Sequence, residues 1–313
     1  MIMASEPFLP IELEREIFEI SAIRHPKIAP VLLRVARRVL IWIEPLLYRV
    51  MRVNKFCRRA AAFLEATKKK PPSFFADSVR ALCFDNWCDW SVDEARNVLK
   101  LCKGVTNFAA NARFYTPAML PVLATMRIQR LVVCLADLFG SFEAIDFTHP
   151  LFSKITHLTI GDCFSSVKEH IYAKLPTLPA LTHLCLYSVA SPTTCTPELL
   201  LTDCVRLELL VVLWGRSYID SATGMAANTP VRDVRLVVSV YSDYWADWNA
   251  GAAGLPDLWT RAENVVARRR VMTNKRVVDL PDSCTGLYQL SYVSVQWTVG
   301  FTSPTFPLKP TSN

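Results

Sequence analysis

The stretches ITHLTI at residues 155–160 and LTHLCL at residues 181–186 lie 26 residues apart and repeat one pattern. In both, apolar residues occupy the first, fourth and sixth positions, and histidine occupies the third. The alternation at the end of each stretch sends one set of side chains to one face of a strand and the intervening set to the other. The pattern therefore predicts a short strand in each copy.

Further copies of this pattern run along most of the chain. They begin at Val79, Val105, Ile128, Ile155, Leu181, Leu207 and Val231, at intervals of 26, 23, 27, 26, 26 and 24 residues. The copy at Val105 is weak, because Ala110 stands at its last apolar position. Such a period resembles that of leucine-rich repeats, whose strand-plus-helix units bury their apolar faces only against one another.

Helix starts lie between the strand copies. The starts are the capping boxes Ser91/Glu94 and Ser166/Glu169 and the pairs Thr116-Pro117 and Thr196-Pro197. Strands and helices that alternate every 25 residues or so predict an α/β fold with a parallel, curved sheet. The strand residues that we expect to point into one core are Leu82, Phe84, Leu131, Val133, Leu158, Ile160, Leu184, Leu186, Leu210 and Val212.

The intervening strand residues are expected on the opposite, concave face. They are Arg130, His157, Thr159, His183, Cys185, Tyr187 and Arg235. Curved solenoids bind partners on this face, and arginine and tyrosine are enriched among residues that dominate interfaces. We therefore predict that this face binds a protein substrate. The alternative is that these are ordinary solvated residues of the strands.

Residues 1–55 predict a small helical module. Apolar residues from Ile11 to Ala22 recur near the helical period, and His25-Pro26 ends that pattern. A second helical stretch runs to Val39, and a third is expected to open at Glu44-Pro45 and reach Met51. Three helices in about 45 residues bury little surface, so the module is expected to need a partner.

This module resembles an F-box, of the kind found in large families of F-box-like proteins in mushroom-forming fungi. The matching residues are Leu9, Pro10, Leu13, Ile17, Phe18, Val35, Pro45, Leu46, Leu47 and Tyr48. Ala36 and Val39 depart from the usual pattern. The resemblance implies docking to the Skp-type adaptor of a cullin–RING ubiquitin ligase, with the repeats recruiting a substrate. The alternative is a repeat scaffold without ligase coupling, in which the helices cap the first repeat.

Four segments are therefore expected along the chain. Residues 1–55 form the F-box-like module, 56–78 a linker, 79–283 the repeat array with a C-terminal helix, and 284–313 an atypical tail. Within the array, residues 241–255 are expected to form a loop and Leu258 to Met272 a helix. The tail has three readings: a final hairpin, a disordered segment, or sequence from an imperfect gene model.

Charge and composition favour a protein that works away from membranes and nucleic acids. Residues 1–80 hold 15 Lys and Arg against 8 Asp and Glu, and the remainder is neutral. No basic patch with interleaved aromatics follows, which argues against nucleic-acid binding. The start resembles no secretory signal, so a cytoplasmic or nuclear location is expected. Lys68-Lys69-Lys70 is either a nuclear localisation signal or part of a solvated linker.

The sequence carries none of the common catalytic or metal-binding motifs. The chain has nine glycines and no phosphate-binding loop, no nucleophile elbow and no His-Glu-x-x-His sequence. Cys83, Cys88 and Cys102 lack the paired spacing of zinc ligands. His157 and His183 share one repeat position, so copying of the repeat explains them more simply than metal ligation. We predict no cofactor and no metal; the enzyme alternative needs distant residues to converge in a pocket.

Overall fold

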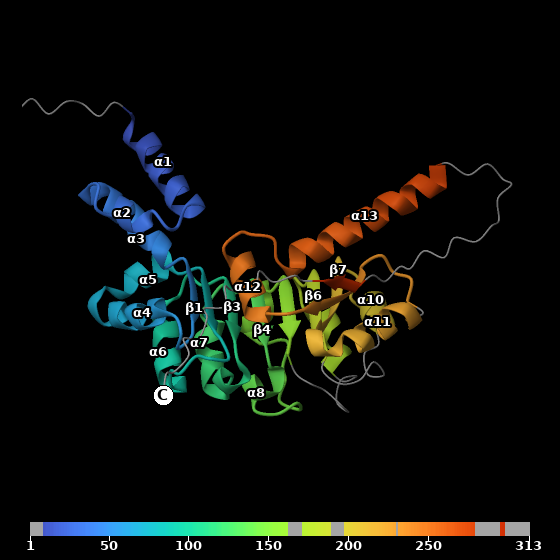
Figure 1. Cartoon of the computed structure of the whole chain (residues 1–313). Coiled ribbons are helices and arrows are strands. Elements are labelled where there is room, and N and C mark those ends of the chain that lie inside the picture. Colours follow the sequence, from blue (N-terminus) through green and yellow to red (C-terminus); the bar gives the residue numbers. More distant parts are fainter. Residues whose placement is uncertain (1–8, 162–170, 189–196, 230, 279–294, 298–313) are drawn as a thin grey trace, which may run out of the picture. The chain divides into compact units, whose positions relative to one another are not determined.

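The computed structural model describes residues 9–161, 171–188, 197–229, 231–278 and 295–297. The chain falls into two compact units, 1–156 and 157–313. Each unit is α/β, and every strand pair reported within them is parallel and joins strands that are consecutive along the chain (Figure 1). The predicted α/β class with parallel strands is confirmed. Among the described helices, none is both long enough and apolar enough to cross a membrane.

The first unit opens with three helices. They are α1 (Ile11–Arg24), α2 (Ala29–Leu32) and α3 (Arg37–Leu47). Their small core is made of Ala22, Ala29, Val39 and Ile43. Pro45 does not open a third helix, as the sequence suggested, but lies in the last turn of α3. Val39 and Ile43 lie one turn apart on the buried side of α3, so the helical pattern continues up to the proline. Pro45 has no N–H to donate, and the helix ends within the next turn.

A parallel sheet follows in the same unit. Its strands are β1 (Val50–Val53), β2 (Ala81–Phe84), β3 (Asn107–Ala110) and β4 (Arg130–Val133). The connecting helices are α4 (Arg58–Lys69), α5 (Pro72–Ser78), α6 (Val92–Leu101), α7 (Leu120–Ala124) and α8 (Leu135–Phe139), with short 3-10 turns at Ala112–Phe114, Pro117–Met119 and Pro150–Lys154. The predicted capping box of Ser91 and Glu94 starts α6 and is confirmed.

The expectation of a linker over 56–78 was wrong. These residues contain all of α4 and α5, and the strand β1 before them pairs with β2, Val50 opposite Ala81. Phe63 and Phe75 bring these helices into the core, since both side chains are fully buried. The sheet therefore begins inside the segment that we had assigned to the helical module.

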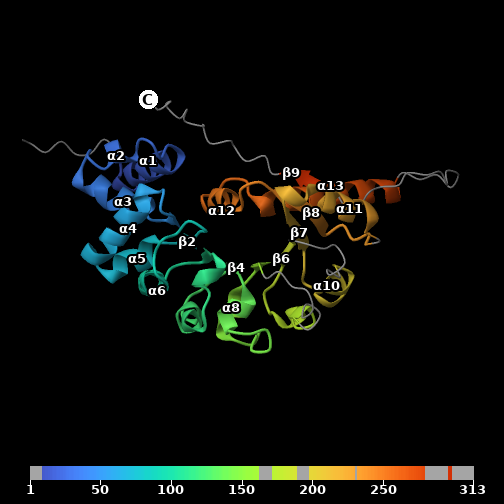
Figure 2. The same cartoon turned by 60° about the horizontal axis from the view of Figure 1, so that its bottom comes forward.

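The second unit contains the remaining strands. They are β5 (His157–Ile160), β6 (His183–Ser188), β7 (Leu209–Gly215), β8 (Leu236–Tyr241) and β9 (Val295–Trp297). The helices are α10 (Pro197–Asp203), α11 (Ile219–Asn228), α12 (Tyr244–Ala252) and α13 (Leu258–Val278), with 3-10 turns at Leu175–Thr177 and Arg216–Tyr218. Figure 2 shows α13 on one side of β6 and β7 and α10 on the other.

The repeat pattern locates six strands correctly and misplaces one. The copies from Val79 to Leu207 each hold a strand that begins at their third residue. In the last copy, Leu236 rather than Val234 pairs with Leu210, so β8 is shifted by two residues. All ten residues predicted to point inward are buried, each at most 4% exposed. The core positions that the pattern predicts are thus confirmed within each unit.

The C-terminal part differs from its expectation in one element. The expected helix from Leu258 is confirmed and extends to Val278. The expected loop 241–255 instead contains α12, because the Asp243 carboxylate caps this helix by accepting from the backbone N–H of Ala246 at 2.9 Å. Of the tail 284–313, only β9 lies within the described residues, where it pairs in parallel with β8. The predicted starts at Ser166/Glu169 and Thr196 lie outside them.

Replacing Leu184 by alanine tests the core. Its side chain is 0% exposed in β6, so we expect Leu184→Ala to lower the free energy of unfolding by about 2–5 kcal/mol. The measurement is urea unfolding followed by circular dichroism. The control is Val205→Ala, which trims a side chain that is 84% exposed and is expected to change stability by less than about 0.5 kcal/mol. Equal unfolding midpoints for the two variants would contradict the placement of Leu184.

Candidate docking surface

The three N-terminal helices, called the helical module from here on, carry an unusual amount of exposed apolar surface. Ile17 is 52% exposed, Val35 is 56% exposed and Ile41 is 63% exposed. The module's other exposed large apolar side chains are Leu9, Ile11, Leu13, Ile20, Ile23, Ile28, Val31 and Leu40. Single exposed apolar residues are ordinary on protein surfaces, but a gathering of this size in under 40 residues marks an interaction site.

The helix α1 is apolar on two opposite faces. Phe18 and Ala22, four residues apart, pack against the core of the module. Leu13, Ile17 and Ile20 follow the spacing of four and three residues that places side chains on one face, here the face turned away from that core. They are 48%, 52% and 43% exposed. A helix that is apolar on both faces is normally covered on both, so this stripe has the character of a contact surface.

The helical module is held to the rest of its unit at the C-terminal end of α3. Tyr48, directly after α3, contacts Phe63, Phe74 and Phe75, with ring centroids 5.3–6.1 Å apart. Lys70 Nζ lies 2.7 Å from the carboxylate of Glu44. A cap on the first repeat would have turned its apolar stripe toward the sheet. The stripe on α1 is instead exposed, while the anchoring contacts come from the other end of the module.

The residues that the F-box resemblance selected fall into two groups in the structure. Leu9, Pro10, Leu13, Ile17 and Val35 are exposed. The second group is half-buried and comprises Phe18, Pro45, Leu46, Leu47 and Tyr48. Phe18, Leu46 and Leu47 pack on the module's own core. The first group is available to a partner, and the second builds the module. Sequence reasoning left out Ile20, which completes the stripe at helical spacing from Ile17.

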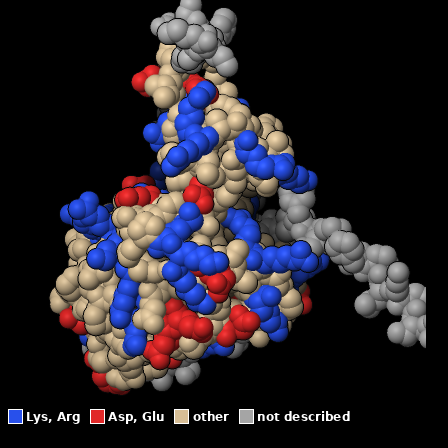
Figure 3. Space-filling view, turned by 90° about the vertical axis from the view of Figure 1, so that its left-hand side faces the viewer, with Lys and Arg blue, Asp and Glu red and all other residues tan. Residues whose placement is uncertain are grey.

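Charged side chains surround the apolar surface. The Arg38 guanidinium donates to both carboxylate oxygens of Glu14, at 2.7 Å for the shortest contact, which ties α3 to α1. This charge-assisted pair raises the pKa of Arg38. Figure 3 shows blue Lys and Arg atoms spread over tan surface on this side of the first unit. Residues 9–47, which hold the module, carry six Lys and Arg against five Asp and Glu, so the positive surplus of residues 1–80 lies mainly after the module.

The face expected to bind a substrate is covered in the second unit. Val211, Leu213 and Val237 pack with Leu258 and Ala262 of α13 in one apolar cluster. Of the predicted substrate-binding residues, Cys185 is 0%, Thr159 3% and His183 8% exposed. The expectation of an open face is therefore wrong over β6 to β8. The reason is that β7 is apolar at every position, LLVVLW from 209 to 214, so both of its faces need cover.

The other predicted substrate-binding residues are only partly exposed. Arg130 and His157 begin β4 and β5, and Tyr187 lies in β6. The Tyr187 ring lies 5.4 Å from Tyr241 and 6.5 Å from Tyr244, centroid to centroid. These three tyrosines, called the tyrosine cluster, join β6, β8 and α12.

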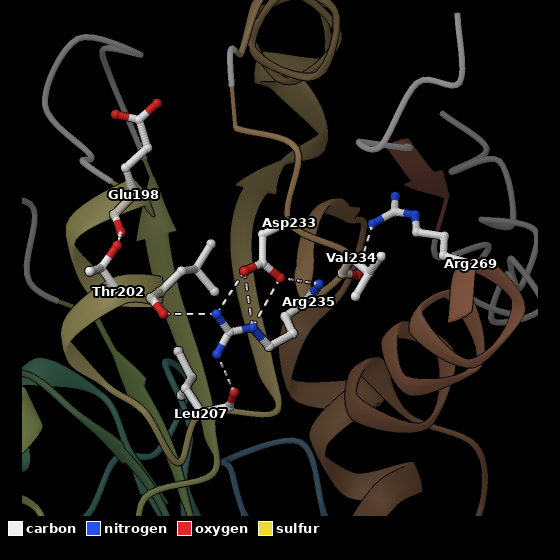
Figure 4. Close-up of polar contacts among 8 residues, drawn as sticks. Glu198, Thr202, Leu207, Asp233, Val234, Arg235 and Arg269 are labelled. Carbon is white, nitrogen blue, oxygen red and sulfur yellow. Dashed lines mark hydrogen bonds and ion pairs between the residues drawn. The ribbon is translucent and has the colours of Figure 1, made fainter. Parts of the chain in front are cut away.

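Arg235 is engaged within its own unit (Figure 4). Its guanidinium donates to both carboxylate oxygens of Asp233, the shortest contact being 2.6 Å. It also donates to the backbone carbonyls of Leu207 at 2.9 Å and Leu201 at 2.8 Å. Because β8 starts at Leu236, Arg235 precedes the strand instead of projecting from its face. We therefore assign it a structural role: its hydrogen bonds connect the segment before β8 to the segment before β7.

Burial dominates the chemistry of the thiols. Among the described residues, the buried cysteines are Cys83, Cys88, Cys102, Cys185 and Cys204. Burial raises the pKa of the Cys88 thiol to about 11 and that of Cys102 to about 12. Thiols with such pKa values stay protonated at neutral pH and act as small apolar side chains.

No family model and no curated protein matches this sequence. The resemblance to F-box proteins therefore depends on the residues of the helical module quoted above.

Loss of the Arg235 guanidinium should destabilise the second unit. Arg235→Met keeps much of the aliphatic stem but removes the guanidinium donor from two carbonyls and leaves the Asp233 carboxylate with only the backbone N–H of residue 235. We expect a loss of about 1–3 kcal/mol in the free energy of unfolding. The control, Arg216→Met, changes an exposed arginine of the same unit and should unfold like the wild type. Identical midpoints for both variants would contradict the structural role.

The same pair should make stability depend on pH. Burial raises the pKa of Asp233, but hydrogen bonds and charge from Arg235 outweigh it, so the net pKa lies below its ordinary value. The stabilisation is then fully present above about pH 4 and is lost as the pH falls through the lowered pKa. We expect Asp233→Asn to be less stable than the wild type at pH 7 and to approach it at pH 2–3. A constant difference across that range would contradict this.

Proposed function

We propose that this chain is a non-catalytic substrate-recognition subunit of an SCF-type cullin–RING ubiquitin ligase. The helical module docks a Skp-type adaptor, and the remainder recruits a protein substrate. The single observation that supports docking is the exposed stripe of Leu13, Ile17 and Ile20 on a helix whose opposite face is already packed. The F-box resemblance supplies the identity of the adaptor.

The stripe is large enough to matter energetically. Full burial of a leucine or isoleucine side chain is worth about 1.5–3 kcal/mol, and these three are about half exposed. Covering them contributes roughly 1 kcal/mol or more each, before any contribution from Val31, Val35 and Ile41. Such a surface suits a partner that presents an apolar groove.

The tyrosine cluster is the best-supported place for the substrate. With the sheet face covered by α13, Tyr187, Tyr241 and Tyr244 remain partly exposed at the start of α12. Trp245 adds to the cluster, its ring 5.3 Å from that of Tyr244. Tyrosine and tryptophan combine a large apolar ring with a polar atom, which is why they dominate many protein interfaces. We propose that the substrate contacts this cluster.

Docking is tested with the double variant Leu13→Asp/Ile17→Asp. Both side chains are exposed, so the fold should persist, whereas two carboxylates placed in an apolar contact should lower adaptor affinity more than tenfold. The measurement is binding of purified Skp-type adaptor by calorimetry, together with co-purification of adaptor and cullin from native cells. The matched control is Leu199→Asp/Val205→Asp, which changes two exposed apolar residues of the second unit.

Two results would overturn the docking role. One is failure of the folded wild-type chain to bind the adaptor. The other is unchanged affinity in Leu13→Asp/Ile17→Asp. Adaptor binding without cullin in the purified complex would contradict coupling to a ligase and leave a repeat scaffold as the function.

A further inference from the structure

Three side chains with metal-binding atoms converge in the second unit. His157 begins β5 and His183 begins β6, and these residues are direct partners in the parallel ladder. Glu263 approaches from α13, and its Oε1 lies 3.1 Å from His183 Nε2. One ligand atom from each of the three residues lies within 4.8 Å of the other two. We propose that His157, His183 and Glu263 form a binding site for a divalent transition-metal ion of the Zn²⁺ class.

The surroundings of His183 fit a metal ligand. Its Nδ1 lies 2.8 Å from the hydroxyl of Thr182, and its Nε2 faces the Glu263 carboxylate. Histidines that bind metals usually have their second ring nitrogen fixed by a polar partner in this way. When Nδ1 carries the proton, the Nε2 lone pair points at carboxylate oxygen, and a cation between the two removes that repulsion.

The ligand set selects the metal. Two imidazole nitrogens and one carboxylate oxygen suit Zn²⁺ and its transition-metal neighbours, while Mg²⁺ and Ca²⁺ prefer oxygen ligands throughout. Three protein ligands leave a fourth tetrahedral position for water. Glu263 is half exposed, 49% for its side chain, so that position is reachable from solvent, while His183 lies beneath it and is 10% exposed.

Metal binding requires a small rearrangement that can be observed. The two imidazole rings are stacked, with centroids 4.1 Å apart and planes inclined by 9°, so their nitrogen lone pairs lie in two nearly parallel planes. In a tetrahedral site the ligand atoms lie about 3.3 Å apart and their lone pairs converge, so one ring must turn out of the stack. Trp259 lies edge-on to both rings, at 5.2 Å from His157 and 5.8 Å from His183. Its fluorescence should report the movement.

The site would also fasten α13 to the sheet. Glu263 and Trp259 lie one turn apart on α13, and Ala262 and Val266 of the same helix pack on β6 to β8. A metal bound by residues of two strands and one helix binds only the folded unit, so it should raise the unfolding temperature. This consequence does not depend on the adaptor or on the substrate.

The test is calorimetric titration of the chelator-treated full chain with Zn²⁺, in parallel with tryptophan fluorescence, to which Trp259 contributes, and thermal unfolding. We expect one equivalent to bind and to raise the unfolding temperature. Titration with Co²⁺ should give the intense visible absorption of a four-coordinate ion. The buried thiols are retained in every variant, so any binding by cysteine is common to all samples.

Two substitutions remove ligands with little effect on the core. Glu263→Gln keeps an amide that can bond His183, and His157→Ala removes the less buried histidine; each should weaken Zn²⁺ binding at least tenfold. His25→Ala, which removes an exposed histidine of the first unit, is the matched control and should bind like the wild type. Absence of Zn²⁺ binding by the folded wild type, or equal affinity in all three variants, would overturn the site.

Discussion

Parallel pairing of consecutive strands in register is the constraint on which most of this structure depends. Neighbouring strands lie about 4.8 Å apart, so equivalent residues of successive copies must stack side to side. Leu158 therefore lies beside Leu184, and His157 beside His183. A leucine that recurs in successive copies of the repeat extends the core, and a histidine that recurs forms a pair of neighbouring imidazoles. Residues at equivalent positions of successive sequence copies are therefore neighbours in the sheet.

The sequence predicts those parts of the fold that depend on local pattern. The inward-facing strand residues, such as Leu131 and Ile160, follow from alternation within six residues, and all of those predicted are buried. The cover of β7 by α13 joins residues about 50 positions apart, and only the unbroken apolar run of β7 hinted at it. Strand β1 was missed because its alternation directly follows a helical pattern. Glu263 carries no local signal, since an exposed glutamate on a helix is ordinary.

The two parts of the chain deal differently with surplus apolar surface. In the second unit, the second face of the sheet is covered from within the chain, by the last long helix. In the helical module, the second face of α1 has no such cover among the described residues, and Ile17 remains half exposed. The four residues of the module's core, Ala22, Ala29, Val39 and Ile43, bury little surface. Covering α1 would therefore both recruit a partner and stabilise the module.

The unequal length of the connecting segments has an evolutionary consequence. Intervals between strand copies range from 23 to 27 residues, yet every pairing reported within the units is parallel between consecutive strands. Helices and turns on the outside therefore absorb insertions and deletions that would shift the register of a hairpin. Because a strand bonds only to its neighbours, duplication of a whole copy adds a strand without altering the others. Such a chain can diversify rapidly in its connecting segments while its ladder stays intact.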